Sequence, residues 1–282
     1  MRLARHGPAG HERPIVAGID GVWRDLSSLT HDIDGSFLSD GLGAARAALE
    51  SASLPPITSP VGRFGPPLSS VGKIICIGLN YVDHARETGA AIPGEPVMFL
   101  KTPDTVIGPD DDVLVPRLST KTDWEVELAV VMGAPARYLD SPDQAAGCIA
   151  GFTISNDVSE REFQIERGGQ WDKGKNCETF NPLGPWITSY DEVIDPQNLA
   201  MRLWVNGTLR QNSNTSNMIF DVAYLVWYLS QFLVLRPGDV INTGTPHGAA
   251  LGLADHPYLK AGDVMEVEIE GLGRQRQVLG AA

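Results

Sequence analysis

The stretch Trp124-Glu125-Val126-Glu127-Leu128-Ala129-Val130-Val131-Met132-Gly133 places two carboxylates two residues apart at the start of an otherwise apolar segment. A segment of this composition predicts a β-strand, in which residues i and i+2 share a face. The side chains expected to enter a core are those of Trp124, Val126, Leu128 and Val130. Glu125 and Glu127 then point together to the other face. Because two neighbouring carboxylates repel each other, a hard divalent ion bound through their oxygens is the simplest way to stabilise the pair.

A solvated stripe is the more common meaning of a lone Glu-x-Glu pair, since charged residues are mostly exposed. Residues 265–270, where three glutamates alternate with apolar residues, have the same spacing. We expect that segment to be a half-buried strand with its glutamates in solvent. Glu125 and Glu127 differ because an apolar run follows them and further polar groups lie downstream.

Asp157 is a third carboxylate, at the end of a predicted strand over residues 148–158. Its side chain is expected on the same face as Thr153 and Ser155, and polar strand ends are where functional sites are usually built. Three carboxylates and one Mg²⁺ or Mn²⁺ ion leave one negative charge and open coordination positions for water or an anionic, oxygen-rich substrate. The sequence therefore predicts that Glu125, Glu127 and Asp157 bind Mg²⁺ or Mn²⁺.

The segment after Asp157 offers the cations that such an acidic site needs, at Arg161, Arg167, Lys173 and Lys175. Residues 169–176 of this segment also come close to the phosphate-binding loop G-x-x-x-x-G-K-[ST]. However, Asn176 replaces the hydroxyl residue and no apolar strand precedes the loop, so nucleotide binding is disfavoured.

A second polar cluster, Gly78-Leu79-Asn80-Tyr81-Val82-Asp83-His84-Ala85-Arg86-Glu87-Thr88-Gly89, follows an apolar strand. If Asn80 caps a short helix, His84 and Glu87 share one face, and the carboxylate can orient the imidazole and raise its basicity. Taken alone, a His-x-x-Glu pair is more often a surface feature.

A Gly-rich turn, Thr243-Gly244-Thr245-Pro246-His247-Gly248, follows another apolar strand. Its backbone N–H groups and the Thr245 hydroxyl are suited to hold a substrate carboxylate. A tight turn without any ligand fits the same residues equally well.

Composition indicates an ordinary globular protein. The chain has 282 residues, 43% of them hydrophobic, and a formal net charge of −13, which argues against nucleic acid or an anionic membrane surface as a partner. No apolar stretch of secretory length follows the charged N-terminus, so we expect no export. Three widely spaced cysteines support neither a zinc site nor a disulfide framework, and a reducing cytoplasm fits them.

The chain is expected to divide into a small N-terminal β/α domain with a Pro-rich connector, residues 1–68, and a larger domain, residues 69–282. The connector is stiff and contains Leu54-Pro55-Pro56-Ile57-Thr58-Ser59-Pro60. Asn206-Gly207 predicts a two-residue hairpin turn. The clearest helix is expected over residues 219–234, and it is too short and too polar to span a bilayer.

Four ordered motifs resemble the fumarylacetoacetate hydrolase family from about Val71 to the C-terminus. The motifs are Glu125-x-Glu127, the Asn-Asp-Val-Ser-x-Arg-x-x-Gln run of residues 156–164, Gly174-Lys175 and Thr243-Gly244-Thr245-Pro246. The insert at residues 166–175 further resembles 2,4-diketo-3-deoxy-L-fuconate hydrolase and proteins named ureidoglycolate lyase. The resemblance implies a β-rich α+β fold, with a mixed β-sandwich or roll core and few helices, in a homodimer.

The resemblance also implies roles for single residues. His84 and Glu87 would activate water on a segment that orders over the substrate, a role that the flanking Gly89, Pro93 and Gly94 suit. Lys175 would act as a catalytic cation beside the metal. Members often carry a second proline where this chain has His247, whose role stays open.

We therefore expect a metal-dependent hydrolase that cleaves a carbon–carbon bond in a small 2,4-diketo acid or acylpyruvate, including 2,4-diketo-3-deoxy sugar acids, and releases pyruvate. Arg161, Gln164 and Thr245 are the candidates for binding the polar ends of this anionic 2-oxo acid. Decarboxylation, tautomerisation and lyase action stay open as alternatives. A metal-dependent binder of organic acids without activity is the alternative outside enzymes.

Overall fold

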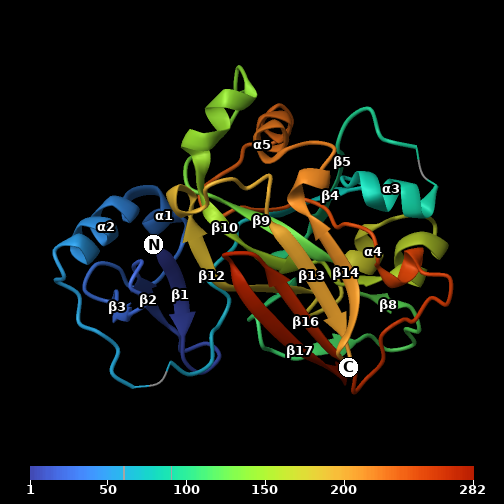
Figure 1. Cartoon of the computed structure of the whole chain (residues 1–282), viewed down its shortest axis with the longest axis horizontal. Coiled ribbons are helices and arrows are strands. Elements are labelled where there is room, and N and C mark those ends of the chain that lie inside the picture. Colours follow the sequence, from blue (N-terminus) through green and yellow to red (C-terminus); the bar gives the residue numbers. More distant parts are fainter. Residues whose placement is uncertain (60, 90) are drawn as a thin grey trace.

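A ten-stranded mixed sheet runs through the molecule in the computed structural model, which describes residues 1–59, 61–89 and 91–282 (Figure 1). Pro60, part of the predicted connector, lies outside the described residues. The strands of this sheet are, in spatial order, β3 (Trp23–Asp25), β2 (Arg13–Ala17), β1 (Arg2–His6), β12 (Asn181–Ser189), β10 (Ile149–Asn156), β9 (Val126–Met132), β15 (Val240–Asn242), β4 (Ile74–Gly78) and β5 (Val97–Lys101), with β6 (Val106–Ile107) paired to β12.

A five-stranded sheet packs against the middle of the large one, over β9 and β10. Its strands are β14 (Thr208–Asn214), β13 (Ala200–Val205), β16 (Val264–Ile269), β17 (Gly273–Ala281) and β7 (Val113–Val115). The turn between β13 and β14 is the predicted Asn206-Gly207 hairpin. A two-stranded sheet is formed by β8 (Thr122–Asp123) and β11 (Ser159–Glu160).

Strand β9 is buried on both faces, which explains its unbroken apolar run after Glu127. Val126, Leu128 and Val130 pack into the hydrophobic core shared with the five-stranded sheet. Ala129 and Val131 pack on the opposite side, in a second core beneath the N-terminal helices. Any polar residue further along β9 would therefore be buried without water.

The helices are few and short, and the predicted β-rich α+β fold is confirmed. They are α1 (Gly35–Asp40), α2 (Leu42–Glu50), α3 (Val82–Thr88), α4 (Asp172–Lys175) and α5 (Val222–Ser230), together with the short 3₁₀ or π segments η1 (Pro103–Thr105), η2 (Pro142–Cys148), η3 (Glu162–Glu166), η4 (Tyr190–Glu192), η5 (Thr215–Asn217) and η6 (Ala250–Gly252). Helices α3 and α4 lie at the end of the molecule opposite β1 to β3 (Figure 1).

The N-terminal residues extend the large sheet, because β1 pairs with β12. They also share the second core with β9 and β10. The two predicted parts of the chain therefore have a common sheet and a common core, and the division at residue 68 stays a prediction.

Helix α5 is shorter than the predicted 219–234. The Asp221 side chain accepts a hydrogen bond from the Tyr224 N–H and so caps the first turn. Ile219 precedes this cap, and its N–H donates to the Asn80 carbonyl oxygen. At the other end, the Ser230 carbonyl accepts the Tyr138 N–H. Within the described ranges, none of the helices has the length and apolar character that a bilayer crossing requires.

Strand β16 is half-buried, as predicted for residues 265–270. Met265, Val267 and Ile269 are buried, whereas Glu266 and Glu268 are partly exposed and pair with arginines at the surface. The same Glu-x-Glu spacing therefore occurs in this chain in two different environments.

Candidate active site

The three predicted metal ligands lie at adjacent strand ends. Strands β9 and β10 are antiparallel, so the start of β9 meets the end of β10, and Ser155 lies opposite Glu127. The Asp157 N–H donates to the Glu125 carbonyl oxygen at 2.9 Å. Carboxylate oxygens of Glu125, Glu127 and Asp157 lie within 4.8 Å of one another, and all three residues are buried.

Electrostatics differ between the two glutamates. Burial, followed by repulsion from Asp157 and Glu125, raises the pKa of Glu127 well above its usual range. Burial alone would raise the pKa of Glu125 as well, but Lys175 and Arg161 lower that pKa to about 2. Glu127 therefore gains most from an additional cation.

The donor set fits a hard divalent ion. It consists of carboxylate oxygens only, it is shielded from bulk water, and like charges in it face each other. Such oxygen sites suit Mg²⁺ and Mn²⁺ better than softer metals. These residues thus provide a centre for such an ion.

Two lysines hold the oxygens of Asp157. The Lys175 Nζ lies 2.8 Å from Oδ2 and also 2.7 Å from the Glu125 Oε2, while the Lys101 Nζ lies 2.5 Å from Oδ1. Burial alone would lower the pKa of Lys175, but Asp157 and Glu125 raise it, so the ammonium stays charged. Lys101 also donates to the carbonyl oxygens of Val158 and Phe180.

Arg161 ties the cluster to its surroundings. Its guanidinium bonds the Asp123 Oδ2 at 2.8 Å, the Glu125 Oε1 at 2.5 Å and the Gln164 Oε1 at 3.0 Å. Asp123 in turn accepts the N–H groups of Ala250 and Leu251. The predicted substrate residues Arg161 and Gln164 are therefore fixed to each other and to the carboxylates.

Lys175 reaches the cluster because the backbone of the preceding residue, Gly174, packs against the backbone of Glu160. A Cβ atom at Gly174 would lie 2.3 Å from the Glu160 carbonyl oxygen, so α4 lies directly against that strand end. The Lys175 ammonium bonds carboxylates, and a turn rather than an apolar strand precedes it, so the phosphate-binding loop interpretation is wrong.

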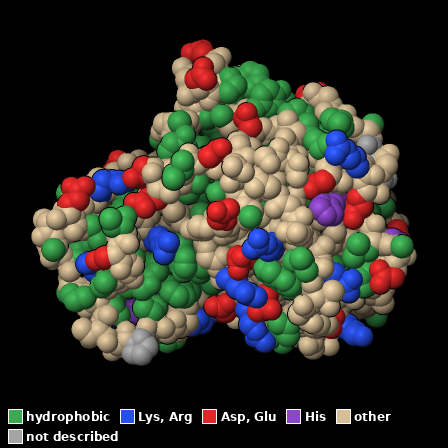
Figure 2. Space-filling model, viewed as in Figure 1, with side chains coloured by type: hydrophobic (Ala, Val, Ile, Leu, Met, Phe, Trp, Pro, Cys, Tyr) green, Lys and Arg blue, Asp and Glu red, His purple; other side chains and the backbone are tan. Residues whose placement is uncertain are grey.

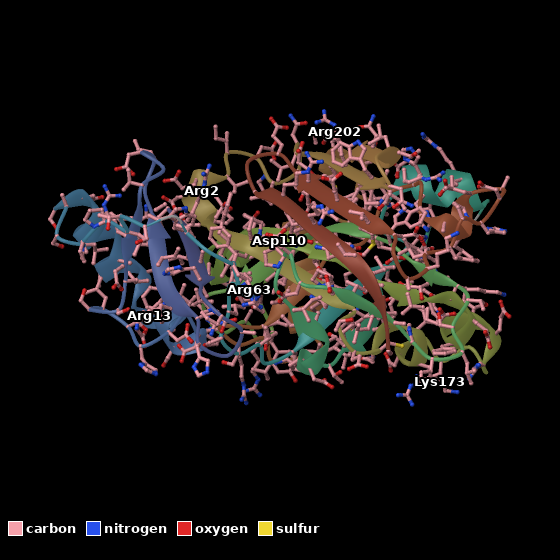
Figure 3. All side chains as sticks on the ribbon, turned by 90° about the horizontal axis from the view of Figure 1, so that it is seen from below. Arg2, Arg13, Arg63, Asp110, Lys173 and Arg202 are labelled. Atoms are coloured by element: carbon pink, nitrogen blue, oxygen red, sulfur yellow. The ribbon has the colours of Figure 1, made fainter. Side chains whose placement is uncertain are left out.

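The other two candidate cations do not join the cluster. Lys173 projects from the surface (Figure 3) and donates to the Arg167 carbonyl oxygen. Arg167 pairs with Glu162 and is half exposed. The spacing of the four candidate cations in the segment after Asp157 therefore did not predict which of them contact the carboxylates.

Helix α3 brings His84 and Glu87 together, with the His84 Nδ1 3.2 Å from the Glu87 Oε2. The Gly248 N–H donates to the same carboxylate at 3.0 and 3.2 Å.

The expectation that Asn80 caps this helix is wrong. Tyr81 occupies the cap position, and the Asn80 amide donates to the carbonyl oxygens of Phe220 and Thr243.

His247 contacts α3 rather than the carboxylate cluster. Its Nδ1 lies 3.0 Å from the Asp83 Oδ2, which also accepts from the Ser213 hydroxyl. The Gly-rich turn therefore contacts α3 twice, through His247 and through Gly248.

A cavity of about 110 Å³ is lined by residues of the carboxylate cluster, of α3 and of the Gly-rich turn. Its polar lining consists of His84, Glu125, Glu127, Arg161, Gln164, Lys175 and Thr245. The Thr245 hydroxyl already donates to the Val126 carbonyl oxygen and accepts from the Gln211 amide, so it can offer only an oxygen lone pair to a ligand. The substrate contacts of Arg161, Gln164 and Thr245 stay predictions.

Sequence reasoning missed Lys101, Asp123 and the aromatic pair Phe99 and Trp171. Lys101 is a lone charge at the end of a short strand, which is the only local signal it gives. Asp123 has a clearer signal, because it continues the alternation of Glu125 and Glu127 by one step. Phe99 and Trp171 line the cavity, but in the sequence they look like ordinary apolar residues.

Comparison with known proteins agrees with this geometry. Residues 73–279 match the family described as fumarylacetoacetate (FAA) hydrolase C-terminal. A relative from Burkholderia multivorans, which carries only a provisional name as a hydrolase, is 51% identical over 100% of both chains.

Two solved structures cover all of this chain and all of their own. Fumarylacetoacetate hydrolase from Exiguobacterium antarcticum is 33% identical, with a TM-score of 0.88. Maleylpyruvate hydrolase from Sphingobium sp. SYK-6, in complex with manganese(II) and pyruvate, is 30% identical, with a TM-score of 0.81. The chain therefore belongs to the fumarylacetoacetate hydrolase family and is an enzyme of that family.

Proposed function

We propose that this enzyme is a hydrolase dependent on Mg²⁺ or Mn²⁺ that cleaves a carbon–carbon bond in a small 2,4-diketo acid or acylpyruvate and releases pyruvate. One observation carries the proposal: two carboxylates of the buried cluster and His84, with its Glu87 partner, meet at one cavity. The manganese and pyruvate bound to the similar maleylpyruvate hydrolase support the same ion and product.

Held by Glu125, Glu127 and Asp157, the ion supplies a Lewis acid for the substrate oxygens and offsets the charge of an enolate. Lys175 adds a fixed positive charge at the same place, because its Nζ lies between Glu125 and Asp157. Arg161 is suited to bind the substrate carboxylate, since its guanidinium lines the cavity.

His84 acts as the general base. With its Nδ1–H donated to Glu87, the basic nitrogen of the neutral ring is Nε2, which takes a proton from water. The water oxygen bonds to carbon 4, the bond between carbons 3 and 4 breaks, and its electron pair enters the pyruvate enolate. A proton from His84 then goes to carbon 3, and the acyl part leaves as a carboxylic acid that ionises.

Glu87 stabilises the imidazolium while it holds the proton. The Gly248 N–H also donates to this carboxylate and so fixes its position. Gly252 makes room for it, because a Cβ atom there would lie 2.3 Å from the Glu87 Oε2.

Isomerisation is the second candidate. A 2-hydroxyhepta-2,4-diene-1,7-dioate isomerase from Mycobacterium marinum is 30% identical with a TM-score of 0.75. Decarboxylation and lyase action would use the same enolate. A binder without activity is disfavoured, because His84, which is held by Glu87, lines the same cavity as Glu125 and Glu127.

A panel assay tests the proposal. The purified protein is mixed with acylpyruvates, with and without Mn²⁺, while loss of the diketo-enol absorbance, pyruvate and CO₂ are followed together. Absorbance loss with one pyruvate per substrate, seen only with metal, supports hydrolysis. CO₂ release without a second acid would indicate a decarboxylase instead.

We also propose a cytoplasmic homodimer without nucleic-acid partners. The net charge of −13 supports the last point, and on the face in Figure 2 Lys and Arg side chains are mixed with Asp and Glu. In the described part of the chain, β5 pairs on one side only and partly exposes Met98 and Leu100, which supports a subunit contact. Light scattering after size-exclusion chromatography tests the dimer.

A further inference from the structure

The cavity has an apolar side in addition to its polar lining. This side is formed by Ile77, Leu79, Phe99, Ile165, Trp171 and Leu251. None of these side chains can donate or accept a hydrogen bond, apart from the indole N–H of Trp171. A substrate bound at the carboxylates therefore shares the cavity with these hydrocarbon side chains.

The apolar wall is built into the fold. The rings of Phe99 and Trp171 meet edge to face at 5.5 Å, and the Lys175 Nζ lies 5.0 Å from the Phe99 ring. Trp171 rests on Gly78, where a Cβ atom would lie 2.6 Å from the indole Cζ3. The wall therefore begins next to the catalytic cation and needs a glycine at the end of β4.

The cations at this cavity are already paired. Among the described residues, those that line it or bond to its carboxylates are Arg161, Lys175 and Lys101, each within 2.8 Å of at least one carboxylate oxygen. The carboxylates in the same network are Glu87, Asp123, Glu125, Glu127 and Asp157. They outnumber the cations by two, the charge of one divalent ion. Arg161 is the cation proposed for the first substrate carboxylate, and these residues offer no further cation for a second one.

We propose that the cavity selects 2-oxo acids whose remote end is short, uncharged and apolar, and rejects those that end in a second carboxylate. The inference rests on the proposed function and names its substrate class. A carboxylate against this wall would lose its hydration without gaining a cation. The selectivity separates this enzyme from the similar maleylpyruvate hydrolase, whose named substrate has a second carboxylate.

Two five-carbon probes test the binding preference directly. 2-Oxopentanoate ends in a methyl group and 2-oxoglutarate in a carboxylate, and neither has the 4-oxo group needed for cleavage. Calorimetric titration into the Mn²⁺-loaded protein should show 2-oxopentanoate binding about tenfold tighter or more. Equal affinities, or tighter binding of 2-oxoglutarate, would overturn the inference. If the protein shows this preference but cleaves no acylpyruvate, the proposed hydrolysis is wrong and the inferred selectivity still holds.

A pair of matched variants tests the wall itself. Ile165 lines the cavity and is 47% exposed, so Ile165→Arg places a cation there without burying it, whereas Ile194→Arg makes the same change at a fully exposed site outside the cavity. Ile165→Arg should shift the affinity ratio toward 2-oxoglutarate by about tenfold, and Ile194→Arg should leave it unchanged. Mn²⁺ affinity checks that both variants are folded. A parent-like ratio in a folded Ile165→Arg protein would contradict the proposal.

Discussion

The ammonium nitrogen of Lys101 lies 2.5 Å from the Asp157 Oδ1, although the two residues are 56 positions apart in the chain. Both side chains are fully buried. Lys101 thus links the edge strand β5 to the carboxylate cluster at the end of β10.

Lys101→Met should lower the free energy of unfolding by about 3–5 kcal/mol, because it leaves a buried carboxylate with one cation fewer. Urea denaturation measures the change. Lys173→Met is the control, since this surface lysine only donates to a backbone carbonyl. A Lys101 variant as stable as the Lys173 variant would show that the pair contributes nothing to stability.

Glu127→Ala should abolish Mn²⁺ binding and activity, whereas Glu268→Ala should leave both nearly unchanged. Both glutamates lie in Glu-x-Glu pairs, but only Glu127 is buried among carboxylates. Calorimetric titration with Mn²⁺ compares the two variants. Equal effects would remove Glu127 from the metal centre.

His84→Ala should lower kcat by roughly 10²- to 10⁴-fold through loss of general-base action, while Mn²⁺ affinity stays near the parent value. Glu87→Gln should be milder, since an amide still contacts the imidazole but cannot stabilise its charge. Steady-state kinetics and Mn²⁺ titration together distinguish the roles. Loss of Mn²⁺ binding in His84→Ala would make His84 a ligand instead.

Gly174→Ala should reduce stability by roughly 1–3 kcal/mol and lower activity, because the new methyl group collides with the Glu160 carbonyl oxygen and displaces Lys175. Gly43→Ala in α2 is the matched control. Nothing lies within 4 Å of its Cβ position, so this change should stabilise the protein by about 0.4–1 kcal/mol. Thermal unfolding of both variants provides the comparison.

Mn²⁺ should stabilise the folded protein by about 2.7 kcal/mol at a hundredfold excess over its Kd, because only the native chain assembles the three carboxylates. Removal with a chelator should reverse the gain. Glu127→Ala should show no such increase, and an unchanged Tm of the parent protein on adding Mn²⁺ would argue against the site.

Strand periodicity was enough to predict that Glu125 and Glu127 share a face and that Asp157 lies at the end of another strand, but not that the two strands are neighbours. Periodicity is a local property, and these residues lie in long apolar strands. Lys101 could not be found in this way, since its contact with Asp157 depends on the order of the sheet, in which three strands lie between β5 and β10. Apolar patterning likewise gives no sign that Phe99 lines a cavity rather than a core.

Helix ends were harder to predict than helices. Asn80 has the preferred side chain for a helix cap, yet tertiary contacts with Phe220 and Thr243 occupy its amide. Phe220, which was predicted to lie in α5, is held by the same amide, because its carbonyl oxygen accepts from Asn80 and its N–H donates to Asn80. In both cases a long-range hydrogen bond overrode a local preference.

Part of the apolar side of the cavity comes from a different kind of structure than its carboxylates. The carboxylates lie at the ends of central strands β9 and β10, whereas Ile165, Trp171 and Leu251 come from η3, the start of α4 and η6. Substitutions in short turns disturb a fold less than substitutions in a central sheet. Evolution can therefore change which acyl group is accepted while the bond-breaking groups stay in place, which gives related enzymes a route to new substrates without new chemistry.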